Sequence, residues 1–205
     1  MTSANKIIRW LLISYSFLFF SHAQAEKIDF ENFFDNQAVT NQIGGLSFLN
    51  ALALQAGASL NEFEFPPNSG TVVLSDDGGP MQILFAAPIS SFGAYFTYLD
   101  PLKMTAFDAD GNVVGSQLSQ FSSNLRLSGD AGSVPNELLS LIYFGGISKI
   151  EIIGSSSGYS FTMDDLSVSS LSSTPIPEPS SFALFVIAFF AIGAVKYHSA
   201  SRWLP

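Results

Sequence analysis

The sequence predicts an all-β protein: a two-sheet β-sandwich (jelly roll) flanked by an N-terminal signal helix and a C-terminal transmembrane helix. Three observations carry this prediction. Short runs rich in Val, Ile, Phe, Thr and Tyr alternate with clusters of Gly, Pro, Asn, Asp and Ser through the middle of the chain. No long stretch of that middle part shows a helical apolar stripe. Both ends of the chain, in contrast, contain uncharged apolar runs.

Residues 1–25 have the three parts of a secretory signal peptide. Lys6 and Arg9 supply the positive charge, and an apolar run follows over residues 10–20. The small residues Ala23 and Ala25 then form the pattern that a signal peptidase reads, so we expect cleavage after Ala25. The alternative is an uncleaved anchor, for which the apolar run is short, since a span needs about 20 residues.

Residues 26–170 are expected to form the exported β-sandwich, which is one domain by size and large enough for a core. The clearest strand places Phe92, Ala94, Phe96 and Tyr98 on one face, and Ser91, Gly93, Tyr95 and Thr97 on the other. Residues 136–142 could instead form a short helix. Strands are predicted at residues 27–32, 46–50, 51–55, 71–75, 81–85, 91–98, 102–108, 113–118, 139–144, 149–153 and 159–168.

Composition excludes several functions for this domain. Residues 26–173 contain four basic and sixteen acidic side chains, a formal charge of −12, which repels nucleic acid. The only histidines are His22 and His198, and the chain has no Cys, so the domain lacks the groups for Ser-His-Asp or Cys-His catalysis. The usual zinc, copper and haem ligands are missing for the same reason, whereas oxygen ligands for calcium remain. We therefore expect no catalytic residues, although a carboxylate-pair glycosidase stays open.

The turns and aromatic residues add further expectations. Residues 108–112 superficially suggest a calcium loop, but Gly111 is fourth in the segment instead of sixth, so we predict a hairpin turn. Residues 76–80 are predicted to be a second hairpin loop. The core is expected to contain Phe30, Phe48, Phe92, Phe96, Phe107 and Phe161. The domain has no Trp, which leaves Tyr95, Tyr98, Tyr143 and Tyr159 as its only aromatic side chains with a polar end.

The C-terminal part reads as a linker over residues 171–179, a transmembrane helix over residues 180–197 and a cytoplasmic tail over residues 198–205. The linker contains Pro177, Glu178 and Pro179. The run after it is apolar all round, unlike a core helix, and is just long enough to cross a bilayer about 30 Å thick. The basic residues that follow it should stay on the cytoplasmic side.

This tail resembles the PEP-CTERM sorting signal, on the strength of Pro177-Glu178-Pro179, the apolar helix and the basic end in that order. The resemblance implies recognition and cleavage by an exosortase in the inner membrane of a Gram-negative bacterium that makes extracellular polysaccharide. The protein would be anchored in that membrane by its C-terminal helix before processing, and then delivered to the cell surface or extracellular matrix. Family members often end in an Arg-rich run, whereas this chain has only Lys196 and Arg202 there.

The domain itself resembles galactose-binding-like and carbohydrate-binding-module jelly rolls. The similarity rests on the order of residues 28–33, 39–48, 89–96, 104–115, 150–153 and 161–168. It implies a sandwich with adjacent first and last strands, and a structural calcium ion near Glu31 and Asp164. Adjacent strands would bring Glu31, Asp164 and Asp165 together, and calcium would neutralise them. The alternative is that these are exposed acids at strand ends.

Together these patterns predict a non-enzymatic exported cell-surface or matrix protein. Its expected partners are an exosortase, the inner membrane and extracellular polysaccharide, and no nucleic acid. A structural or adhesive module without a small ligand is the alternative, and a carboxylate-dependent glycosidase is a third hypothesis.

Overall fold

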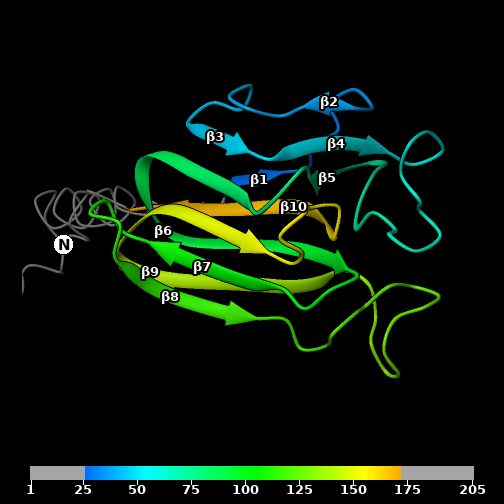
Figure 1. Cartoon of the computed structure of the whole chain (residues 1–205). Coiled ribbons are helices and arrows are strands. Elements are labelled where there is room, and N and C mark those ends of the chain that lie inside the picture. Colours follow the sequence, from blue (N-terminus) through cyan, green and yellow to red (C-terminus); the bar gives the residue numbers. More distant parts are fainter. Residues whose placement is uncertain (1–25, 172–205) are drawn as a thin grey trace, which may run out of the picture. The chain divides into compact units, whose positions relative to one another are not determined.

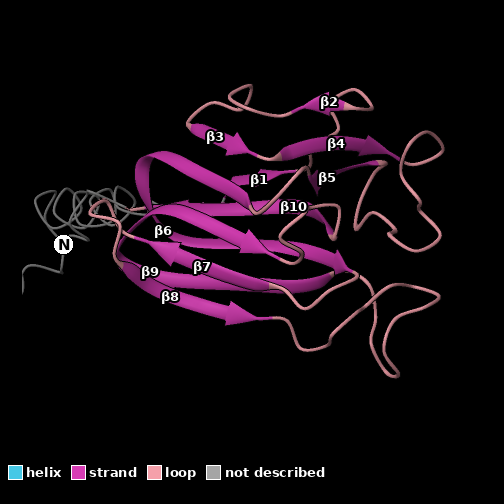
Figure 2. Ribbon diagram, in the orientation of Figure 1, coloured by secondary structure: helices cyan, strands magenta, loops and turns pink. Residues whose placement is uncertain are grey.

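The computed structural model describes residues 26–171. The predicted signal peptide, the Pro177-Glu178-Pro179 motif, the transmembrane helix and the tail lie outside these residues. Figure 2 shows strands and loops throughout the described part and no helix. None of the described residues therefore forms a helix that could cross a membrane. The all-β prediction is confirmed for this part of the chain.

The strands alternate with short loops along the sequence (Figure 1). In chain order they are β1 (Glu26–Ile28), β2 (Gln37–Ala38), β3 (Leu46–Leu49), β4 (Ala51–Gln55), β5 (Val72–Asp76), β6 (Met81–Tyr98), β7 (Lys103–Phe107), β8 (Val113–Leu118), β9 (Glu137–Ile153) and β10 (Phe161–Ser170). Hydrogen bonds connect them in the order β2-β4-β5-β10-β6-β9-β7-β8, with β1 on β10 and β3 on β6. The first and last strands are thus adjacent, as the jelly-roll resemblance implied.

Two long strands connect the two halves of this sheet. β6 and β9 pair antiparallel from Met81 opposite Ile152 to Phe96 opposite Glu137, with register shifts between Leu84 and Ile89 and between Ile89 and Ser91. Side chains from both halves are buried in one continuous apolar cluster. The hydrogen-bonded path therefore folds over itself at these irregular positions, which gives the two layers of a β-sandwich.

The core follows the predicted alternation. Phe92, Ala94, Phe96 and Tyr98 are all buried, and the rings of Phe96 and Phe161 meet edge to face with centroids 5.9 Å apart. Five of the six phenylalanines expected in the core are buried there. Phe107 is the exception: it is only partly buried, and the Lys149 ammonium lies 4.0 Å from its ring centre.

The long strands correct the predicted boundaries. Segments 81–85 and 91–98 belong to one strand, and so do segments 139–144 and 149–153. Pro88 and the pair Gly145 and Gly146 look like turn residues in the sequence, but they mark bends inside continuous strands. The helical alternative for residues 136–142 is wrong, because this segment pairs with β6.

The two predicted hairpins have different outcomes. Residues 108–112 do form the turn between β7 and β8, where the Asp108 amide donates to the Asn112 carbonyl at 3.0 Å. The hairpin predicted at residues 76–80 is wrong, because β5 and β6 lie on opposite sides of β10. Asp76 is instead buried beside the start of β10, where its carboxylate accepts hydrogen bonds from the Ser160 amide (2.8 Å), the Ser160 hydroxyl (2.8 Å) and the Phe161 amide (3.0 Å).

Candidate functional site

A pair of acidic residues interrupts the regular geometry of β10. Asp164 and Asp165 are consecutive, so a regular strand would direct their side chains to opposite faces. The pairing of β10 with β6 shifts register after Asp164, and Asp165 adopts a φ of 50°. This bulge bends the strand. As a result, both carboxylates face the same segment, residues 68–69.

The two carboxylates share the donors of this segment. Oδ2 of Asp164 accepts the backbone N–H groups of Asn68 (2.7 Å) and Ser69 (2.9 Å). Asp165 accepts the Asn68 side-chain amide and the Ser69 hydroxyl, each at 2.7 Å. The Lys27 ammonium of β1 lies 3.1 Å from Oδ2 of Asp165. The cluster therefore joins the first strand, the last strand and the loop before β5.

Glu31 contacts the adjacent part of the same loop. Its Oε1 accepts the backbone N–H groups of Thr71 (2.9 Å) and Val72 (2.8 Å), and its Oε2 accepts the Thr71 hydroxyl at 3.1 Å. Gly70 lies directly against this carboxylate, where a Cβ atom would overlap it, and its φ of 55° also favours glycine. Glu31 thus determines the course of residues 70–72.

The structure brings these acids to one loop without forming a set of metal ligands. Within residues 26–171, no group of three or more Asp, Glu, His or Cys side chains is arranged to hold a metal ion. Calcium takes six to eight oxygen ligands in proteins. Here N–H groups, hydroxyl groups and one ammonium face the carboxylate oxygens. Hydrogen-bond donors thus occupy the positions around these oxygens that calcium would take. Calcium binding by Glu31, Asp164 and Asp165 stays a prediction from the sequence.

The two neighbouring acids have opposite pKa shifts. Burial raises the pKa of Asp164 to about 6, and the charge of Asp165 adds to this effect. Burial also raises the pKa of Asp165, but hydrogen bonds from Ser69, Asn68 and Lys27 together outweigh it, so that pKa lies below its ordinary value. Of the two acids, Asp164 is therefore the one that takes up a proton first as the pH falls below neutral.

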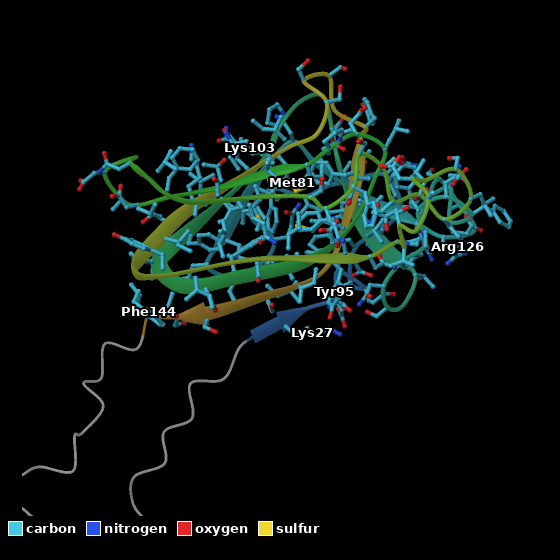
Figure 3. The ribbon with its side chains drawn as sticks, turned by 90° about the horizontal axis from the view of Figure 1, so that it is seen from below. Lys27, Met81, Tyr95, Lys103, Arg126 and Phe144 are labelled. Atoms are coloured by element: carbon cyan, nitrogen blue, oxygen red, sulfur yellow. The ribbon has the colours of Figure 1, made fainter. Side chains whose placement is uncertain are left out.

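Beside this cluster, the outward face of β10, β6 and β9 is lined by small polar residues and one tyrosine. We call it the Tyr95 face. Tyr95 lies opposite Asp164 on β10 and Leu138 on β9. Figure 3 shows Tyr95 on the same side of the domain as Lys27. The members of the face are Ser91, Gly93, Tyr95, Leu138, Ser140, Ile142, Ser167 and Ser169, which the strand register places on one side.

Gly93 lies at the centre of the Tyr95 face. It pairs with Ser140 on β9 and with Ser167 on β10. A Cβ atom at this position would lie 3.1 Å from the Ser167 hydroxyl oxygen and 3.5 Å from the Ser140 Cβ atom. Glycine therefore leaves the centre of the face without a side chain, next to two serines and near Tyr95.

Tyr95 is the tyrosine whose polar end is available on this face. Tyr98 is buried and donates to Glu137; burial and that carboxylate raise its pKa to about 12. Tyr159 donates to Asp77, and the ring of Tyr143 lies over Gly145. The Tyr95 side chain is half-buried and forms no hydrogen bond with another residue of the described part. No polar side-chain atom that is fully buried in that part lacks a partner, so the Tyr95 hydroxyl retains some contact with solvent.

Glu62 and Glu64 are two acids close together in the sequence, and their contacts bear on the glycosidase hypothesis. Glu64 lies in a loop and accepts the backbone N–H groups of Leu127 (3.0 Å) and Ser128 (3.2 Å). These hydrogen bonds keep its pKa below the ordinary value, whereas a carboxylic acid that acts as a general acid needs a raised pKa. The carbonyl oxygen of Glu62 accepts from Arg126 at 3.4 Å. These contacts connect two loops.

No protein-family model matches the sequence, and no curated protein matches it. The solved structures that align with this chain include adhesin domains, carbohydrate-binding modules and an α-L-arabinofuranosidase, of which 25% is covered. The K2 cleaved adhesin domain of Lys-gingipain has a TM-score of 0.48 and 12% identity, covering 71% of this chain and 99% of that domain. A xylan-binding domain from Paenibacillus barcinonensis has a TM-score of 0.36 and 11% identity, covering 72% and 94%. Likenesses this low carry no information about individual residues or ligands.

The raised pKa of Asp164 predicts that the domain becomes more stable as the pH falls from 7.5 to 5. Its folded pKa of about 6 exceeds the ordinary value of 3.8, so its contribution is complete below about pH 4 and is lost as the pH rises through 6. The difference between pH 7.5 and pH 5 should be about 1.4 kcal/mol, because only about one pH unit of this interval lies below the folded pKa. Urea unfolding of residues 26–173 with EDTA measures it. Asp164→Asn should flatten the profile, and an equally steep profile in that variant would contradict the assignment.

The calcium prediction has its own measurement. If Glu31, Asp164 and Asp165 bind calcium, millimolar calcium should raise the melting temperature of residues 26–173, and EDTA should reverse the increase. Asp108→Asn is the control: it should show the same increase as the parent, because that acid belongs to the β7–β8 turn. A melting temperature that calcium leaves unchanged would exclude the site.

Proposed function

We propose that the protein is a non-enzymatic, exported surface or matrix protein whose β-sandwich binds extracellular polysaccharide on the Tyr95 face. The observation that carries this proposal is the partly exposed Tyr95 side chain beside a strip of glycine and serine on a sheet surface.

The chemistry of this face suits a sugar ring. A tyrosine ring offers an apolar surface for the C–H groups of a pyranose, and its hydroxyl can donate and accept. Ser140 and Ser167 lie on either side of Gly93, so a sugar beside Tyr95 would meet the Ser140 hydroxyl and the acceptor oxygen of Ser167, whose proton is donated to the Gly93 carbonyl. Leu138 and Ile142 are exposed and add apolar contact area along β9.

Charge restricts the kind of polysaccharide. The formal charge of residues 26–173 is −12, and a polyanion would be repelled at low salt. Lys27 lies opposite Ser167 of this face, and it is already paired with Asp165. A neutral polysaccharide is therefore the class of ligand that this surface favours.

A binding role also agrees with the acids of the domain. Asp76, Asp164 and Asp165 accept several hydrogen bonds each from neighbouring segments. Glu64 does the same between two loops. Such acids connect segments of the fold, which supports a non-catalytic module over a carboxylate-dependent glycosidase.

Export and sorting rest on the terminal sequences. Ala23 and Ala25 support removal of a signal peptide, and Pro177-Glu178-Pro179 before an apolar run supports handling by an exosortase. A polysaccharide-binding domain is useful only where it can meet the polymer, so this destination agrees with the proposed activity of the face.

Replacing Tyr95 should remove sugar binding. We expect residues 26–173 to bind a neutral glycan on an array or in affinity electrophoresis, and Tyr95→Ala to bind at least roughly tenfold more weakly, equivalent to about 1.4 kcal/mol. Tyr159→Ala is the matched control, because this exposed tyrosine lies away from the face and contacts Asp77. Equal binding by both variants would move the site elsewhere, and binding by neither parent nor variants would favour a structural or adhesive module.

The sorting proposal predicts a shortened C-terminus. Mass spectrometry of the protein from the cell surface should find a mature form that ends near Pro177-Glu178-Pro179 and lacks residues 182–195. A strain without the exosortase should retain the tail in its membrane fraction. An intact tail in the normal strain would refute processing.

A further inference from the structure

The bends of β6 and β9 form an exposed apolar end of the domain. Phe144 is 82% exposed, Ile142 is 67% exposed and Tyr143 is 37% exposed. The neighbouring bend of β6 adds the exposed residues Ala86, Ala87 and Pro88. These six residues are called the bend surface below. Proteins expose single apolar residues routinely, whereas several exposed apolar residues on two neighbouring bends are typical of an interaction site.

The bend surface is also uncharged in a strongly acidic domain. No charged residue occurs between Met81 and Tyr98 or between Leu138 and Ser148, although residues 26–173 have a formal charge of −12. Anionic lipid headgroups repel a surface rich in carboxylates. The bends can therefore approach a membrane more closely than a surface with the average charge of the domain.

The described chain ends beside these bends. A Cβ atom on Gly146 would lie 3.1 Å from both the Leu171 side chain and the Pro88 side chain. β1 begins at Glu26, opposite Val168, so both ends of the domain leave it near the end of β10. Figure 3 shows Phe144 and Arg126 at opposite ends of the domain. The segment that follows Leu171 thus starts at the bend surface.

The length of that segment indicates what would cover the bend surface. Only nine residues lead from Leu171 to Ser180, where the predicted transmembrane helix begins, and three of them are prolines. An extended Pro-rich segment covers about 3.1 Å per residue, so the reach is at most about 28 Å. A bilayer that contains this helix would lie within that distance of the bends.

We propose that the bend surface rests on the bilayer while the protein is anchored by its C-terminal helix. Phe144 and Ile142 would enter the region between headgroups and acyl chains, and Tyr143 would lie at headgroup level, as aromatic residues do in membrane interfaces. The contact would present the short segment 172–179 close to the membrane surface. A second copy or another protein is the competing occupant, and the experiment separates these cases.

The absence of cysteine from the chain allows a clean test. Phe144→Cys is labelled with a polarity-sensitive fluorophore, and the full chain is placed in nanodiscs of phosphatidylcholine that hold one copy each. We expect blue-shifted emission and quenching by lipids brominated near the headgroup. Leu127→Cys is the control, because Leu127 is 73% exposed and follows Arg126 at the other end. The label at position 127 should show the emission of a fluorophore in water.

Several results would overturn the proposal. Phe144 and Leu127 labels with the same emission would show that the bends stay in water. A blue shift that appears only in discs with two or more copies would identify a second copy as the occupant. A chain that does not remain with the discs would remove the premise of an anchored domain.

A variant distinguishes contact by the bend surface from simple proximity. In the background Ile142→Asp and Phe144→Asp, a label on Ala87→Cys should lose its blue shift and its lipid quenching, because two charges oppose entry into the interface. Circular dichroism should stay unchanged, since both substituted side chains are exposed in the parent. Retained quenching with an unchanged fold would show that the short segment 172–179 alone keeps the label near the bilayer.

Discussion

The long pairing of β6 with β9, which resumes after each bend, is the constraint on which the rest of the structure depends. These strands run from one layer of the sandwich into the other, and their ladder extends from Met81 and Ile152 to Phe96 and Glu137. Their inward side chains fill the core, which must stabilise a domain that has no disulfide bonds. The same alternation directs Tyr95 and Leu138 outward. The two bends that the ladder needs are also where Phe144 becomes exposed.

A second constraint operates at the opposite edge of β6, where β10 departs from regular pairing. The bulge at Asp165 directs two acids toward one loop, and Lys27 and the amides of residues 68 and 69 compensate their charges. Acids in the last strand are costly to bury, and donors from a distant segment offset that cost. The arrangement connects both ends of the domain chain to the loop before β5. It also determines the border of the Tyr95 face, because Asp164 is the register partner of Tyr95.

Local patterns in the sequence predicted those elements whose hydrogen bonds and burial follow simple alternation. The boundaries of β4 and β8 agree with the prediction, and the buried set Phe92, Ala94, Phe96 and Tyr98 was evident from its period of two. The bends were mistaken for turns because Pro88 and Gly146 have the same local chemistry in either setting. Only the ladder between segments about 60 residues apart decides between the two cases.

The candidate site also combines features that the sequence shows with features that only tertiary contacts create. Tyr95 was visible as an outward residue of its strand, whereas only the structure shows that Tyr98 and Tyr159 are occupied by contacts with acids. The adjacent acids Asp164 and Asp165 were visible too, and a calcium ion is the simple way to neutralise them. A positive φ at Asp165 and the donors of Asn68 and Ser69 have no signature in the sequence, because they arise from the packing of segments about 96 residues apart. The sequence therefore locates the charges, and the tertiary contacts determine what neutralises them.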